Sequence, residues 1–186
     1  MLHTTGDEFA DPLFSGLEFG THSGEVSMQP DEINLNITPA GNPGSFLAEE
    51  TVQLSDSQRY TLYLSGLPGQ LDGVLATAGS RRLATHAKFR YYQGAARFSA
   101  VDLYVVPAAS DISLLSPLLS SVPYTGMSGY LSLEPDMYDI VLTWPGTKTV
   151  VAGPLRVDLA ARGVYETISA DSQQTDVAQL LYFEID

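Results

Sequence analysis

The sequence repeats itself at an offset of 105 residues. Residues 23–41 (SGEVSMQPDEINLNITPAG) align without a gap on residues 128–146 (SGYLSLEPDMYDIVLTWPG), with seven identities in nineteen positions. The same register later places Tyr60 on Tyr165. A repeat of this length is the size of a domain and far exceeds the ~20–50-residue periods of solenoids and propellers. The chain is therefore predicted to contain two copies of one domain in tandem.

The offset also predicts that the first copy is incomplete. We place the first domain at residues 1–80 and the second at residues 85–186, which begins about twenty residues earlier in its repeat than Met1 does. The first copy would then lack its N-terminal strands, and its sandwich would expose unpaired backbone groups. We expect it to be completed by strand exchange with another chain, giving a homo-oligomer, or covered by the second copy.

Composition limits the class of partner. Hydrophobic residues make up 44% and charged residues 17% of the chain, which is typical of a globular protein. With 22 acidic against 9 basic residues, the net charge is −13, which disfavours binding to nucleic acid or to an anionic membrane surface. The chain has no cysteine, which excludes disulfides and thiolate metal sites. No apolar run approaches the ~18 residues of a membrane helix, so no membrane insertion by this segment is predicted.

Alternation of apolar and polar residues predicts strands throughout. Val101, Leu103 and Val105 should share one face of a strand, and Ile140 and Leu142 should share the buried face of another. Further strand-like runs occupy residues 25–28, 33–38, 50–54, 59–65, 88–91, 130–133, 155–159, 164–169 and 179–185. Turn residues separate these runs, and a leucine-rich stretch at 111–121 predicts one helical turn inside a loop. The predicted fold is all-β, with two tandem immunoglobulin-like antiparallel β-sandwich domains.

Residues 89–105 (FRYYQGAARFSAVDLYV) resemble the opening signature of a bacterial family called domain of unknown function 4397. That signature is an apolar-Arg-apolar strand, a short loop, and then Ala-Val-Asp-apolar-Tyr-Val, matched here at Arg90, Asp102 and Tyr104. The resemblance covers the second repeat almost entirely. It implies β-sandwich modules that are periplasmic, on the cell surface or secreted, that often occur in tandem, and that have no established activity. Residues 93–97 depart from the family pattern, which has His-Ala-Ser-Pro-Asp there.

The matched residues are interpreted as determinants of the fold. Arg90 and Asp102 are predicted to form a cross-strand charge pair, and Tyr165 to be a core or corner tyrosine. The histidines His3, His22 and His86 have no partner at metal-ligand spacing, and no Gly-x-Ser-x-Gly elbow is present. The chain is therefore predicted not to be an enzyme.

Two alternatives remain open at the level of binding. Asp7, Glu8 and Asp11 supply hard oxygen ligands and are the candidates for a calcium site, although they do not follow the spacing of a calcium loop. A second pair of carboxylates, Asp136 and Asp139, could also supply oxygen ligands, but it does not fit a calcium loop, and Asp136 follows a proline in a turn, where aspartate is favoured by the turn geometry.

Aromatic side chains are the candidates for a carbohydrate-stacking surface. Tyr91 and Tyr92 are adjacent in a predicted strand, so one ring should point outward, and Trp144 lies at a predicted hairpin tip. We therefore expect a non-catalytic, extracytoplasmic structural or binding module, whose partner is an unknown protein or glycan at the cell surface. The alternative is a carbohydrate- or calcium-binding adhesion module of the cell surface.

Overall fold

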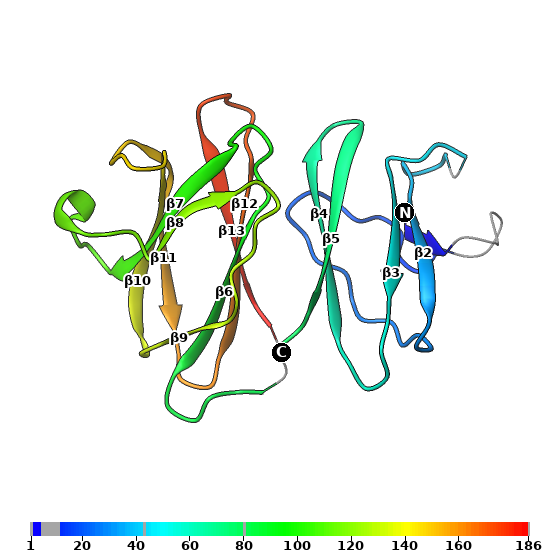
Figure 1. The fold of residues 1–186 in the computed structure, drawn as a ribbon, viewed down its shortest axis with the longest axis horizontal. Coiled ribbons are helices and arrows are strands. Elements are labelled where there is room, and N and C mark those ends of the chain that lie inside the picture. Colours follow the sequence, from blue (N-terminus) through cyan, green and yellow to red (C-terminus); the bar gives the residue numbers. More distant parts are fainter. Residues whose placement is uncertain (1, 5–11, 43, 80, 186) are drawn as a thin grey trace. The chain divides into compact units, whose positions relative to one another are not determined.

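The structure is a computed structural model that describes residues 2–4, 12–42, 44–79 and 81–185. Its described elements are strands and one short 3-10 turn (Figure 1). The prediction of an all-β, sandwich-like fold is confirmed. Contacts along the chain divide it into two compact units, residues 1–78 (unit 1) and residues 79–186 (unit 2).

The described strands of unit 2 form two four-stranded sheets. One sheet has the order β11-β10-β7-β8 and the other has the order β13-β12-β6-β9. Neighbouring strands are antiparallel, except that β6 and β12 run parallel. The strands are β6 (Ala87–Gln93), β7 (Ala100–Pro107), β8 (Leu119–Pro123), β9 (Leu131–Leu133), β10 (Asp136–Thr143), β11 (Val150–Leu159), β12 (Val164–Asp171) and β13 (Ala178–Glu184).

One apolar core lies between the two sheets of unit 2. Leu103, Ile140 and Leu142 are fully buried in it, and Val105 packs against it, so the faces predicted from alternation are confirmed. The other face of strand β7 is covered as well. There Tyr104 belongs to a second apolar cluster that includes Ile112 of the turn η1 (Ile112–Leu114), which is the single helical turn predicted for the leucine-rich loop.

Unit 1 is built from shorter sheets and a smaller core. Its described strands form a three-stranded sheet, β1-β2-β3, and a two-stranded sheet, β4-β5. Leu35, Ile37 and Val52 form its buried apolar cluster, with partly buried leucines packed around them. The strands are β1 (Leu2–Thr4), β2 (Glu32–Ile37), β3 (Ala48–Gln53), β4 (Tyr60–Leu67) and β5 (Gln70–Thr77).

Strands β2 to β5 follow the order of β10 to β13 at positions about 105 residues earlier. The cross-strand register agrees at the first hairpin, where Asn34 lies opposite Thr51 and Asp139 lies opposite Arg156. One strand prediction is wrong, because residues 25–28 are not in a strand. Their counterpart in unit 2, β9, is held by pairing with β6, and no described strand of unit 1 takes the place of β6.

Candidate binding surface

Trp144 lies at the tip of the hairpin that joins β10 to β11. Its backbone N–H donates to the carbonyl of Thr149 at 3.1 Å, and Gly146 completes the turn with φ of 70°, a conformation that favours glycine. The indole ring is tilted against Phe98 with ring centroids 5.1 Å apart. The Trp144 side chain nevertheless remains 37% exposed. It therefore packs locally and also presents an aromatic surface to solvent.

The buried carboxylate of Asp102 holds this tip in place. Its Oδ2 accepts a hydrogen bond from the Gly146 N–H at 2.8 Å, and its Oδ1 accepts one from the Ser121 N–H at 2.7 Å. The predicted charge pair between Asp102 and Arg90 is wrong, because their strands β7 and β6 belong to different sheets. Asp102 instead joins Gly146 in the β10–β11 hairpin tip to Ser121 in strand β8.

Arg90 forms a buried ion pair with Glu166 on the neighbouring parallel strand. Their Nη2 and Oε1 atoms lie 2.5 Å apart. Tyr130 covers the pair, since its hydroxyl donates to Glu166 Oε1 at 2.7 Å and the Arg90 guanidinium lies 4.3 Å from its ring centroid. Burial, followed by the hydrogen bond to Glu166, raises the pKa of Tyr130 to about 12. The Tyr130 hydroxyl also accepts the N–H of Gly79 at 3.1 Å, which anchors the start of unit 2 to this network.

The structure corrects the expectation for Tyr91 and Tyr92. Their side chains are 0% and 1% exposed, so neither ring is available to stack on a sugar. Alternation does place them on opposite faces, but β6 is an inner strand of its sheet and is covered on both faces. The Tyr91 hydroxyl lies 2.8 Å from Ser169 Oγ, and burial raises the pKa of Tyr91.

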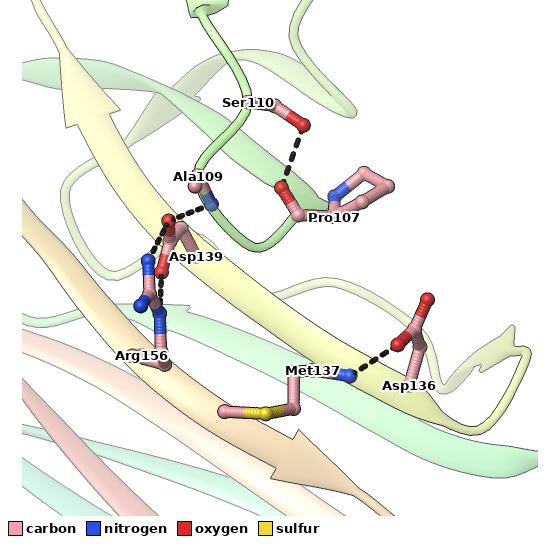
Figure 2. A network of polar contacts seen from close by, with 7 residues as sticks. All are labelled: Pro107, Ala109, Ser110, Asp136, Met137, Asp139 and Arg156. Carbon is pink, nitrogen blue, oxygen red and sulfur yellow. Dashed lines mark hydrogen bonds and ion pairs between the residues drawn. The ribbon is translucent and has the colours of Figure 1, made fainter.

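A second network of polar contacts surrounds Asp139 on the outer face of strand β10 (Figure 2). Arg156 donates from Nε and Nη2 to the two carboxylate oxygens, each at 2.9 Å, and the Ala109 N–H donates to Oδ2 at 2.6 Å. The hydrogen bonds from Arg156 and then from Ala109 lower the pKa of Asp139. Asp136 accepts the Met137 N–H at 2.7 Å and lies apart from Asp139 in Figure 2. The two carboxylates therefore do not converge on one ligand position.

The calcium candidates Asp7, Glu8 and Asp11 lie outside the described residues. Within the part of the chain that the structure describes, no group of three or more His, Asp or Glu side chains is placed to hold a metal ion. The described residues also include no helix long and apolar enough to cross a membrane.

Sequence reasoning missed the role of Asp171. Its two carboxylate oxygens accept the N–H groups of Ala96 at 2.8 Å and Arg97 at 3.1 Å, which fixes the loop after β6. Buried Gln93 closes the same loop, donating to the carbonyl of Phe98 at 2.7 Å and accepting the N–H of Ala95 at 2.9 Å. The separation of about 75 residues between Asp171 and this loop left no local signal that could have revealed the contact.

Comparison with known proteins adds little to this geometry. No family model matches the chain, and no curated protein matches it. Among solved structures, the chain is similar to the C-terminal domain of AlgF from P. aeruginosa, with 17% identity and a TM-score of 0.38, over 54% of this chain and 99% of that one. A TM-score this low carries no argument about function. Membership in the family called domain of unknown function 4397 therefore stays a prediction.

Proposed function

We propose that this chain is a non-catalytic β-sandwich module that acts outside the cytoplasm as a structural or binding element. The observation that supports it most is that the buried and partly buried carboxylates of unit 2 are already engaged in hydrogen bonds or ion pairs. Asp102 binds backbone N–H groups of a hairpin tip and of strand β8, Asp171 binds those of a loop, and Asp139 and Glu166 pair with arginines. Such bonds make the loops and sheets rigid, and they occupy the oxygen atoms that general acid or base chemistry would require.

The composition and the residue pattern support the extracytoplasmic location. The chain lacks cysteine and carries a net charge of −13, and residues 89–105 resemble a family of extracytoplasmic modules. Fractionation of cells that produce the native protein, followed by detection with an antibody, tests this location. We expect the protein in the periplasmic, surface or secreted fraction, and finding it only in the cytosol would contradict the proposal.

One observation favours the alternative of a carbohydrate-binding module. The partly exposed side chain of Trp144 lies on a hairpin that Asp102 holds in place, and a rigid aromatic side chain that is partly in contact with solvent is typical of contact surfaces. A glycan array probed with the purified chain tests it. A saturable signal that Trp144→Ala abolishes would establish glycan binding, whereas a signal unchanged in the variant would assign the contact elsewhere.

The calcium alternative is tested separately by titrating the purified chain with calcium in a calorimeter. Heat that saturates in the wild type and disappears in Asp11→Ala would establish that site. A panel of ester and glycoside substrates completes the test of the main proposal. We expect no turnover above that of buffer, and turnover that a single substitution in the chain removes would overturn the non-catalytic assignment.

A further inference from the structure

The loop between β7 and β8 presents an exposed leucine on an ordered backbone. The Leu114 side chain, in the turn η1, is 95% exposed, and that of Leu115 beside it is 39% exposed. The loop is attached to the sheet beneath it, because Ile112 packs against Tyr104 of β7. An exposed apolar side chain on a fixed backbone is the arrangement of an anchor residue in a protein interface.

Two buried carboxylates hold the backbone at the two ends of this loop. Ala109, at its start, has φ of 65°, and Ser121, just beyond its end, has φ of 52°. Asp139 Oδ2 accepts the N–H of Ala109 at 2.6 Å, and Asp102 Oδ1 accepts that of Ser121 at 2.7 Å. Residues other than glycine adopt this left-handed conformation at an energetic cost, and such residues concentrate at functional sites. Unit 2 therefore maintains an unfavourable backbone on both sides of the exposed leucine.

Lys148 supplies a positive charge beside the two leucines. Its Nζ donates to the Tyr104 hydroxyl at 2.9 Å and to the carbonyl of Leu115, and it lies 4.7 Å from the Tyr104 ring centroid. Both acceptors are neutral, and Lys148 forms no ion pair with the described residues. We call Leu114, Leu115 and Lys148 the leucine surface. It combines exposed apolar side chains with a cation that has no carboxylate bound to it.

A turn in unit 1 has the complementary side chains. Leu17 and Phe19 are 40% and 69% exposed, and Glu18 between them is exposed as well. The N–H of Thr21 donates to the carbonyl of Glu18 at 3.2 Å, and Gly20 has φ of 76°, so the chain turns sharply with Phe19 at the corner. The Glu18 carboxylate is in no ion pair with the residues that the structure describes. This acidic turn therefore presents a carboxylate between two exposed apolar side chains.

The two units also differ in charge. Of the 9 lysine and arginine residues only Arg59 lies in unit 1, where it pairs with Glu25, whereas the 22 acidic residues divide equally between the units. Unit 1 is therefore strongly negative, and unit 2 holds nearly all of the cations. A contact between unit 1 of one copy and unit 2 of another has more favourable electrostatics than a contact between two copies of unit 1.

We propose that copies of this chain associate head to tail, with the acidic turn of one copy on the leucine surface of the next. In this contact Glu18 pairs with Lys148, and Phe19 packs against Leu114. The two surfaces differ, so a pair of copies leaves one of each unoccupied, and the association extends into chains of copies or closes into a ring. Because the contact is small, the association is weak and depends on concentration. This inference rests on the proposed structural or binding role and names a second copy as the partner.

Sedimentation of the full chain at rising concentration measures the association. We expect the mean mass of the wild type to rise with concentration. Glu18→Lys and Lys148→Glu each bring like charges together across the contact, and each should lower the association constant by about tenfold or more. A wild type that stays monomeric at about 1 mM, where even weak contacts are populated, would overturn the proposal.

Mixing these two variants locates the contact. Each variant alone can form only contacts with like charges at the pair, whereas the mixture allows opposite charges to meet, both between the two unchanged positions and between the two substituted ones. We therefore expect an equimolar mixture to recover the association that each variant has lost. Circular dichroism verifies that both variants are folded. A mixture that associates no better than either variant would overturn the pairing of Glu18 with Lys148.

A third variant tests the apolar part of the contact. Leu114→Asp places a charge at the centre of the leucine surface and should abolish the association, while the 95% exposure of Leu114 leaves the fold unaffected. The matched control is Val177→Asp, a 42% exposed position of unit 2 in the hairpin between β12 and β13, which should associate as the wild type does. Association that survives Leu114→Asp, or that both substitutions weaken equally, would overturn the assignment to this surface.

The outcome is independent of the tests of the proposed function. A monomeric chain would overturn the head-to-tail contact, yet it would leave the cell fractionation and the substrate panel unchanged, because neither depends on self-association. The glycan array with Trp144→Ala is also separate, since Trp144 is not part of the leucine surface. Failure of this inference and failure of the proposed function are therefore distinguishable.

Discussion

Unit 1 and unit 2 use matching strands but enclose very different amounts of apolar side chain. Among the described residues, the main core of unit 2 contains sixteen buried apolar side chains, and that of unit 1 contains three. Burial of apolar surface is the dominant favourable contribution to folding. Unit 2 should therefore be the more stable unit, and shared strand order does not imply shared stability.

A pair of polar residues at equivalent positions of the two units shows a second difference between them. Across β10 and β11, Asp139 and Arg156 form an ion pair, whereas across β2 and β3 the hydroxyl of Thr51 donates to Asn34 Oδ1 at 2.5 Å. In both hairpins the two residues lie opposite each other at equivalent positions, and their side chains bond to each other. The hairpin thus accepts a charged or a neutral pair, provided that the two partners match.

The largest expected effect comes from truncating a core residue in each unit. Leu142→Ala should lower the free energy of unfolding of unit 2 by about 3–5 kcal/mol, because its close-packed core cannot collapse around the cavity. The counterpart substitution, Ile37→Ala, should cost unit 1 about 2 kcal/mol, because its smaller core is less enclosed. Hydrogen exchange of each unit in denaturant, read by mass spectrometry, measures both losses. Equal losses would show that the two cores are equally tight.

A smaller effect is expected at a tyrosine that both units share. The hydroxyl of Tyr165 accepts the N–H of Ala160 at 3.1 Å, and that of Tyr60 accepts the N–H of Ser55 at 3.0 Å, in both cases five residues earlier. Tyr165→Phe should cost about 1 kcal/mol, because its buried ring admits no water to replace the bond. Tyr60→Phe should cost less, since its bond is exposed. Denaturant melts of the two variants provide the comparison, and a larger loss for Tyr60→Phe would contradict it.

The smallest expected effect is a pH dependence confined to unit 2. The Arg156 hydrogen bonds hold the pKa of Asp139 below its unfolded value of about 3.9. The folded state therefore gains stability from ionised Asp139 above that value, and loses it as the pH falls through the folded pKa. Asp139→Asn, which reproduces the residue of unit 1, should lower stability at neutral pH and flatten its decline in acid. Thermal melts between pH 2 and pH 7 measure this, and an unchanged slope would exclude Asp139 as the titrating group.

Alternation along single strands predicted much of the fold, because burial of a strand face is a local property. The inward positions of Leu103 and Leu142 followed from such patterns. Pairing between distant strands is not a local property. The partner of Arg90 is Glu166, 76 residues away on a parallel strand, and no periodicity in the sequence indicates which strands become neighbours.

The candidate site shows the same limit. Adjacent aromatic residues must point to opposite faces of a strand, but the sequence does not say whether both faces are covered, and for Tyr91 and Tyr92 they are. The prediction for Trp144 depended on a turn, which is local, and the residue does lie at a hairpin tip with part of its ring exposed. Asp102, which fixes that tip, was interpreted as half of a charge pair, because its backbone partners, Ser121 and Gly146, lie 19 and 44 residues away in the sequence.

The two hydrogen bonds of Asp102 also affect the entropy of binding at Trp144. By tying the hairpin tip, and Ser121 of strand β8, to strand β7, they remove the conformational freedom that an aromatic residue on a loose loop would lose upon contact. A partner that docks on Trp144 meets a surface already ordered during folding, so the association does not bear that entropic cost again. Replacing Asp102 would therefore weaken such an association without removing any atom that touches the partner.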